Sequence, residues 1–151
     1  MVAAWPSVKS QNRGQAAAAF AASSRPLVLI VEDHDDTRFL LKYLITSRGF
    51  DVAEAENGEE AVEVAERLHP GLILMDVSLP RLDGISAMRR MRELATLGKV
   101  PIIFLSGHAE LAAQARARDA GCDDYLVKPL DIGRLDRVLA QYFCVENLAR
   151  T

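Results

Sequence analysis

Apolar runs alternate with helical patterns along most of the chain. Five short runs rich in branched residues or with alternating polarity, bounded by turn signals, predict β-strands. They cover residues 27–31, 51–55, 72–75, 100–106 and 124–127. Apolar residues at helical spacing predict helices over residues 35–48, 59–68, 85–95, 109–120 and from 131 onward. The segment therefore alternates between five strands and five helices.

The apolar repeats indicate which faces of the helices are available for packing. The repeats are Phe39, Leu40, Tyr43, Leu44 and Ser47 in the first helix, Ala61, Val62, Ala65 and Leu68 in the second, Met88, Met91 and Leu94 in the third, and Ile132, Leu135, Val138, Leu139 and Tyr142 in the last. The last repeat is expected to face inward, with Asp131 as a helix N-cap. The fourth helix is rich in alanine and arginine and has only a weak apolar face.

Regular alternation of strands and helices is typical of an α/β fold. It predicts a parallel sheet covered by helices on both faces, with right-handed crossovers. In open sheets of this kind, binding sites form beyond the carboxyl ends of the strands. The residues that follow each strand are therefore the first candidates for function.

Composition adds limits to this picture. The chain has 151 residues, which suits one domain, and its net charge of −3 gives no indication of nucleic-acid binding. Cys122 and Cys144 are too few for a disulfide framework and are expected to be reduced thiols, which favours a cytoplasmic location. No apolar run approaches the length of a membrane span.

The two ends of the chain differ from the middle. Residues 1–25 are rich in alanine and are expected to form a flexible extension, with a weak amphipathic anchor as the alternative. The folded domain is expected to cover residues 26–143, and residues 144–151 to form a short tail.

Polar side chains follow four of the five predicted strands. Glu32 and Asp33 follow the first, Asp76 ends the third, Ser106 ends the fourth, and Lys128 follows the fifth. Two like charges about 5 Å apart repel by about 3 kcal/mol at an effective dielectric constant near 20. Three carboxylates on one rim therefore call for a cation, and an all-oxygen ligand set favours Mg²⁺.

Such a rim has the groups that phosphoryl transfer requires. Lys128 can pair with Asp76 or with a phosphate oxygen, and Ser106 can donate a hydrogen bond to the same oxygen. Aspartate can act as the covalent nucleophile. Taken singly, each residue has a simpler interpretation as a helix cap, a turn residue or a solvated surface charge. Their occurrence together at four strand ends favours a site.

Four segments resemble the receiver domain of two-component response regulators. They are VEDHDD at 31–36, LILMDVSLPRLDG at 72–84, IIFLSGHA at 102–109 and DYLVKPL at 124–130. The resemblance spans roughly residues 26–143. It implies a flavodoxin-like (βα)5 fold with the strand order 2-1-3-4-5.

The resemblance also implies a role for each acidic residue. Asp76 is similar to the phosphoacceptor, which takes a phosphoryl group from a histidine kinase or a histidine phosphotransfer protein. Asp33 and Asp76 would bind Mg²⁺ directly, the backbone carbonyl of Ser78 would supply a further ligand, and Glu32 would act through a water molecule.

Further positions match the switch machinery of this family. Ser106 is similar to the switch hydroxyl, and Tyr125 to the aromatic residue whose ring turns inward after the hydroxyl moves. Lys128 would bind a phosphoryl oxygen, and its bond to Pro129 is expected to be cis. The face formed by the fourth helix, the fifth strand and the last helix would then change shape for an unknown downstream protein. The chain is expected to act as a stand-alone signalling receiver, and not as an enzyme beyond its own phosphorylation and dephosphorylation.

Three alternatives remain at this stage. DHDDT at 33–37 also fits the nucleophile motif of Mg²⁺-dependent haloacid-dehalogenase-type phosphatases, with Asp33 as the nucleophile, but this leaves Asp76 unexplained. Flavin binding would need small hydroxyl and glycine residues after the first strand, where acids stand. A receiver that signals without phosphorylation is disfavoured by the intact motif set.

Overall fold

The computed structural model describes residues 25–107 and 111–143 of the chain. Its strands are β1 (Leu27–Val31), β2 (Asp51–Ala55), β3 (Leu72–Asp76), β4 (Ile102–Ser106) and β5 (Asp124–Val127). Its helices are α2 (Asp35–Thr46), α3 (Gly58–Leu68), α4 (Gly84–Glu93), α5 (Leu111–Ala120) and α6 (Ile132–Phe143). All neighbouring strands pair in parallel in the order β2-β1-β3-β4-β5, which confirms the predicted flavodoxin-like fold.

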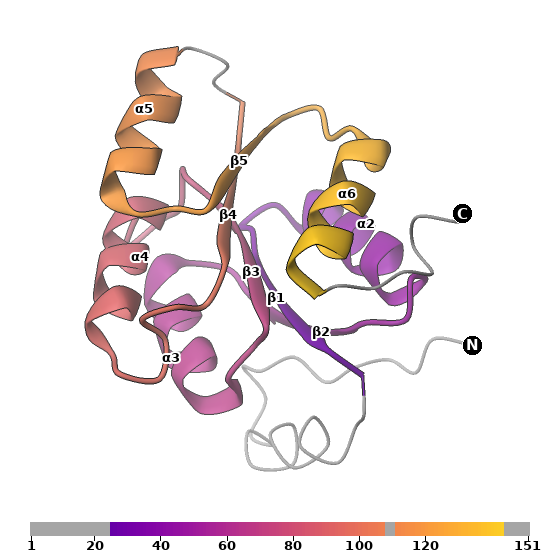
Figure 1. Cartoon of the computed structure of the whole chain (residues 1–151), viewed down its shortest axis with the longest axis horizontal. Coiled ribbons are helices and arrows are strands. Elements are labelled where there is room, and N and C mark those ends of the chain that lie inside the picture. The colour runs from indigo at the N-terminus through magenta and orange to yellow at the C-terminus, as the bar shows by residue number, and fades with distance from the viewer. Residues whose placement is uncertain (1–24, 108–110, 144–151) are drawn as a thin grey trace.

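Helices cover both faces of the sheet (Figure 1). α3, α4 and α5 lie on one face, and α2 and α6 on the other. Successive residues of a strand point to opposite faces, so the central strands are apolar on both sides. In β1, Leu29 and Val31 join the core under α3 and α4, whereas Val28 and Ile30 join the core under α2 and α6. This explains why the central strands show uninterrupted apolar runs.

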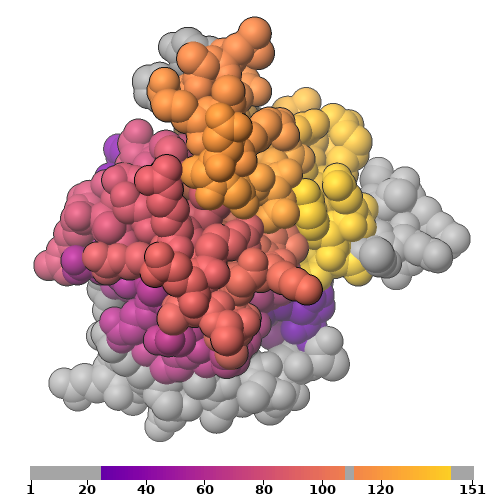
Figure 2. Space-filling model, turned by 60° about the vertical axis from the view of Figure 1, so that its left-hand side comes forward, coloured from indigo at the N-terminus to yellow at the C-terminus, as the bar shows by residue number. Residues whose placement is uncertain are grey.

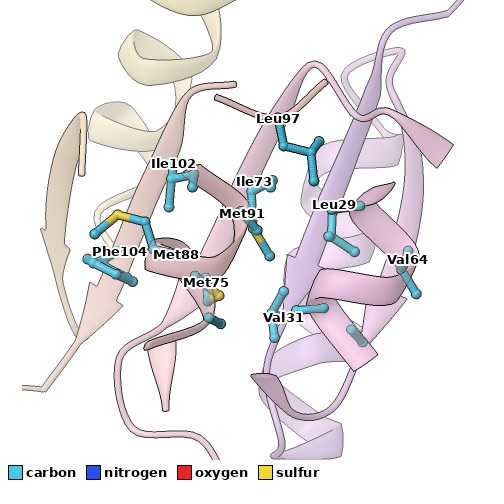
Figure 3. Packing of buried hydrophobic residues seen from close by; sticks show 14 of the residues in the cluster. Leu29, Val31, Val64, Ile73, Met75, Met88, Met91, Leu97, Ile102 and Phe104 are labelled. Carbon is cyan, nitrogen blue, oxygen red and sulfur yellow. The ribbon is translucent and has the colours of Figure 1, made fainter. Parts of the chain in front are cut away.

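The core under α3 and α4 holds the larger of the two apolar clusters. Met88 and Met91 of α4 pack there with Phe104 and Ile102 of β4, as Figure 3 shows. Both methionines are completely buried, as their helical spacing indicated. They are packing residues and not ligands, which agrees with the sequence interpretation.

Most of the apolar repeat predicted for α2 does not face the core. Phe39, Leu40 and Tyr43 are 71%, 53% and 58% exposed, while Leu41 and Ile45 are buried. The helix carries two overlapping apolar stripes, and spacing alone does not say which one packs. Leu41 and Ile45 pack against the sheet, so the predicted repeat that contains Phe39 and Tyr43 faces mainly the solvent.

One residue of α6 departs from the prediction in the same way. Ile132 is 48% exposed, because it lies in the first turn of the helix, whereas Leu135, Val138 and Leu139 are buried as expected. The predicted cap is present: the Asp131 carboxylate accepts a hydrogen bond from the backbone N–H of Gly133 at 2.9 Å.

Several sequence predictions fall outside the described residues. These are the extension up to residue 24, the start of the fourth helix at residues 109–110, the tail at 144–151 and the thiol of Cys144. Within the two described ranges, none of the helices combines the length and the apolar character needed to cross a membrane.

Candidate functional site

The carboxyl ends of β1, β3 and β5 bring three charged side chains into contact. Lys128, just after β5, places its Nζ atom 2.7 Å from Oε1 of Glu32 and 2.7 Å from Oδ2 of Asp76. Glu32 follows β1, and Asp76 is the last residue of β3. The parallel sheet thus gathers, at one rim, residues that are up to 96 positions apart in the chain.

Glu32 is the most deeply buried of these groups, with no exposed surface. Burial by itself would raise the pKa of its carboxyl. The hydrogen bonds from Lys128 and from the backbone and ring of His34 outweigh that effect and hold the pKa at about 2. Glu32 is therefore ionised at neutral pH and forms a fixed negative charge beneath the rim.

Asp76 is also buried, with 6% of its surface exposed. Its Oδ1 atom accepts a hydrogen bond from the backbone N–H of Ser78 at 2.8 Å, and its Oδ2 atom faces Lys128. Burial, joined by the nearby charge of Glu32, raises the pKa of Asp76 against the opposing effect of these two hydrogen bonds. Burial would lower the pKa of Lys128, but the bonds to Asp76 and Glu32 raise it. The ammonium is the main counter-charge of this carboxylate.

A glycine fixes the backbone around Asp76. Gly84 begins α4, and a Cβ atom placed on it would lie 2.5 Å from the backbone oxygen of Asp76 and 3.0 Å from Cα of Val77. The N–H of Gly84 also donates to the carbonyl of Val77 at 2.9 Å. Only a residue without a side chain allows the start of α4 to approach the end of β3 this closely.

The acidic turn after β1 has the donor chemistry of a cation site. Oxygen or nitrogen atoms of Glu32, Asp33 and His34 lie within 4.8 Å of one another. The Oδ1 atom of Asp33 is buried and has no hydrogen-bond partner among the described residues, although Nδ1 of His34 lies 3.3 Å away. A buried carboxylate oxygen without a donor fits a metal ligand, because such atoms are otherwise costly. Asp76 is not part of this tight group.

Ser106 and Tyr125 occupy neighbouring strands next to this rim. Ser106 ends β4 and is 2% exposed, and Tyr125 in β5 is 5% exposed. Both line a cavity of about 350 Å³, together with Ala112, Ala113 and Arg116 of α5. Tyr125 is thus buried in this structure and lines the same cavity as Ser106, the residue to which the resemblance couples it. The peptide bond between Lys128 and Pro129 is cis.

One residue that borders the site was missed from the sequence. Arg38, in the first turns of α2, donates from Nη1 to the backbone carbonyl of Glu32 at 2.8 Å. Its partner on β2 is Glu54, 16 positions away in the sequence, so spacing alone did not reveal Arg38. The only local signal is Asp35, three residues earlier, which accepts a hydrogen bond from Nη2.

Comparison with known proteins identifies the arrangement. Residues 28–140 match the family model described as the response regulator receiver domain. The chain belongs to the response regulator receiver domain family. It is therefore a receiver domain of the two-component signalling type, and this membership goes against the alternative of a haloacid-dehalogenase-type phosphatase.

Curated relatives support the same family. The receiver is 31% identical over 115 residues to the polar-differentiation response regulator DivK of Brucella ovis, a match that covers 76% of this chain and 94% of DivK. It is 31% identical over 123 residues to the regulatory protein AtoC of Escherichia coli K12. That match covers 82% of this chain but only 26% of AtoC, so most of AtoC has no counterpart in the match.

Solved structures place the fold in the same group. The receiver domain of the sensor histidine kinase PA1611 from Pseudomonas aeruginosa PAO1 superposes with a TM-score of 0.75 and 34% identity, over 81% of this chain and 100% of that chain. That structure is described with a magnesium ion coordinated in its active site cleft. A response regulator from Chloroflexus aurantiacus gives a TM-score of 0.76 at 28% identity, over 81% of this chain and all of its own.

Proposed function

We propose that this receiver accepts a phosphoryl group on Asp76 in a Mg²⁺-dependent step. The observation that carries the proposal is the contact of one ammonium, Lys128, with the carboxylates of Glu32 and Asp76 at 2.7 Å each. Asp76 is the member of this group at the end of the central strand β3, with its backbone neighbours held by Gly84. The donor is a phosphohistidine of a histidine kinase or of a histidine phosphotransfer protein.

The residues of this chain position the attack. A carboxylate oxygen of Asp76 forms a bond to phosphorus as the bond between phosphorus and the histidine nitrogen breaks, and the electron pair leaves with the imidazole. Lys128 exchanges part of its contact with Asp76 for an oxygen of the incoming phosphoryl group, and Ser106 also donates a hydrogen bond to the phosphoryl group. These contacts offset the charge that develops on the phosphoryl oxygens.

The proposed ligands of the ion are the carboxylates of Asp33 and Asp76 and the backbone carbonyl of Ser78, with Glu32 acting through water. The buried Oδ1 atom of Asp33, which has no hydrogen-bond partner in the part of the chain that the structure describes, supports this assignment. When bound, Mg²⁺ would neutralise charge on the carboxylates and the phosphoryl oxygens. His34 lies in the same acidic turn, but its ring nitrogen is not a preferred ligand of a hard cation.

Phosphorylation is proposed to alter the face made by α5, β5 and α6. The new charge draws Ser106 and Lys128 toward the phosphoryl group, and Tyr125 responds because it shares a cavity with Ser106. α5 forms one wall of this cavity and buries only Ala117 among its described residues. A helix held by so few contacts can be displaced, which exposes a changed surface to a downstream protein.

The receiver unit is assigned to residues 26–143, with the extension at 1–25 and the tail at 144–151 outside it. The chain acts in the cytoplasm as a phosphoacceptor, and its only chemistry is its own phosphorylation and dephosphorylation.

Acetyl phosphate with Mg²⁺ provides a direct test. Intact-mass measurement is expected to show one added phosphoryl group on the wild type and none on Asp76→Asn, because the amide cannot act as the nucleophile. Asp36→Asn is the matched control, since Asp36 is an exposed acid in the first turn of α2. Label on Asp76→Asn at the wild-type level would refute the assignment. Steady turnover of a simple phosphate monoester that depends on Asp33 would instead favour a phosphatase.

A further inference from the structure

Arg38 connects three elements at the edge of the acidic rim. Its Nη1 atom donates to the carbonyl of Glu32 at 2.8 Å, and its Nε atom donates to Oε1 of Glu54 at 3.3 Å. Glu32 follows β1, Glu54 lies in β2, and Arg38 itself belongs to α2. The Arg38 side chain is only 14% exposed, so these two contacts are largely shielded from water.

The carbonyl of Glu32 is the point where β1 leaves the sheet. The N–H of Glu32 still donates to the carbonyl of Ala55 on β2, at 3.0 Å. Its carbonyl is instead bound by Arg38, so the backbone of Glu32 is held on both sides. The next residue is Asp33, whose side chain carries the buried Oδ1 atom. The direction in which this side chain points therefore depends on the peptide that Arg38 holds.

The charge of Arg38 is balanced locally. Besides Glu54, its guanidinium bonds the carboxylate of Asp35 and lies 3.7 Å from that of Glu56. Glu54 in turn also accepts from Lys42 at 3.2 Å. With three acids around it, Arg38 adds little net positive potential to the rim, so its effect on the rim is geometric.

We propose that Arg38 is a positioning residue for the cation site: by holding the Glu32 carbonyl against β2, it sets the acidic turn in the conformation that binds Mg²⁺. This inference rests on the proposed function, because it takes the acidic turn to be the metal site. Groups that orient ligands in this way typically change metal affinity by about 10- to 100-fold when they are removed.

Arg48, two residues after the last residue of α2, provides a matched control. It also donates to a backbone carbonyl, that of Leu44 at 2.7 Å, and it also pairs with an acid, Asp136 of α6. It lies at the opposite end of α2 from the acidic turn. Arg38→Met and Arg48→Met therefore remove comparable interactions, and only the first concerns the Glu32 carbonyl.

Isothermal titration with Mg²⁺, with no phosphodonor present, measures the effect. Arg38→Met is expected to weaken Mg²⁺ binding by about tenfold or more, and Arg48→Met by less than about twofold, while both lower the stability against urea. Amide exchange at residues 32–34 in the metal-free protein is expected to quicken in Arg38→Met alone. Equal Mg²⁺ affinity of Arg38→Met and the wild type would overturn the inference.

A conservative variant separates geometry from charge and guards against misfolding. Arg38→Lys keeps the charge but loses the planar fork that reaches Glu32 and Glu54 together, so it is expected to weaken Mg²⁺ binding nearly as much as Arg38→Met. Full rescue by lysine would show that charge alone matters and would reject the positioning role. If the wild type itself does not bind Mg²⁺, the proposed function fails. If the wild type and the Arg38 variants bind Mg²⁺ equally, only the positioning role of Arg38 fails.

Discussion

α4 and α5 lie on the same face of the sheet (Figure 1), and each has ten residues in the described part of the chain, yet they are held very differently. α4 buries Ala87, Met88 and Met91 and has a side-chain cap at its start, Asp83. α5 buries only Ala117, and Leu111 in its first turn is 82% exposed. Figure 2 shows the orange segment that contains α5 projecting from the body of the molecule.

The difference assigns separate tasks to the two helices. α4 starts at Gly84, against the backbone of Asp76, so a firmly packed α4 fixes the proposed phosphoacceptor. α5 instead contacts β5 and lines the cavity that holds Ser106 and Tyr125. A rigid support thus lies beside the chemistry, and a loosely held helix lies beside the residues proposed to report it.

The largest expected effect is on the α4 side. Met91→Ala removes a completely buried side chain from the core shown in Figure 3 and should lower the free energy of unfolding by about 2–5 kcal/mol. Urea unfolding followed by circular dichroism measures this. A loss below about 1 kcal/mol would mean that α4 is no better anchored than α5.

A smaller effect is expected at the cap of α4. The Asp83 carboxylate accepts from the N–H of Ser86 at 2.9 Å, and this hydrogen bond lowers the pKa of Asp83 below its ordinary value of 3.8. Asp83→Ala should cost about 1 kcal/mol of stability at neutral pH. Because the folded pKa is the lower one, the ionised carboxylate contributes fully above pH 3.8, and its contribution is lost as the pH falls through the folded value.

Asp83→Asn is the control for this cap. The amide oxygen keeps the acceptor but does not titrate, so the stability difference between the Asn and Ala variants should not change with pH. The difference between wild type and the Ala variant should shrink in acid. If the stability difference between the wild type and Asp83→Ala stays constant down to low pH, the charge of Asp83 plays no part.

The smallest effect is expected in α5. Leu111→Ala shortens a side chain that is mostly in water, so the free energy of unfolding should change by no more than about 0.5 kcal/mol. The same urea assay compares it with Met91→Ala. A loss as large as that of Met91→Ala would show that α5 is firmly packed, and would remove the basis for treating it as the movable element.

The strands and the layers could be predicted from the sequence because a central strand that is buried on both faces appears as an uninterrupted apolar run. A strand covered on both faces has no polar position, and the runs at 27–31 and 72–75 carry this signal directly. The order of the strands came from the family resemblance, since alternation alone is compatible with several orders. The observed order agrees with it.

Helix rotation could not be predicted in the same way. In α2 the stripe with Phe39 and Tyr43 and the stripe with Leu41 and Ile45 are both apolar, and only the second is buried. The contacts of Arg38 and Lys42 with Glu54 on β2 help to set which stripe faces the sheet. These contacts join residues 12 and 16 positions apart, so they have no local pattern.

The proposed site residues were selected from the sequence by one geometric rule, that the carboxyl ends of parallel strands share a rim. The rule brought out Glu32, Asp76 and Lys128, which the structure places in contact. The rule could not identify Arg38, because this residue lies on a helix and its side chain donates a hydrogen bond to a backbone carbonyl, that of Glu32. Every residue has a backbone carbonyl, so the amino-acid sequence does not indicate which one is bound.

The close approach of Gly84 to Asp76 has a consequence for protein design. A designer who transplants this acidic rim onto another parallel sheet must move the whole stretch from Asp76 to Gly84 as a single block. In a host scaffold with any other residue at the position of Gly84, the added side chain would push the following helix outward and tilt the carboxylate of Asp76 with it.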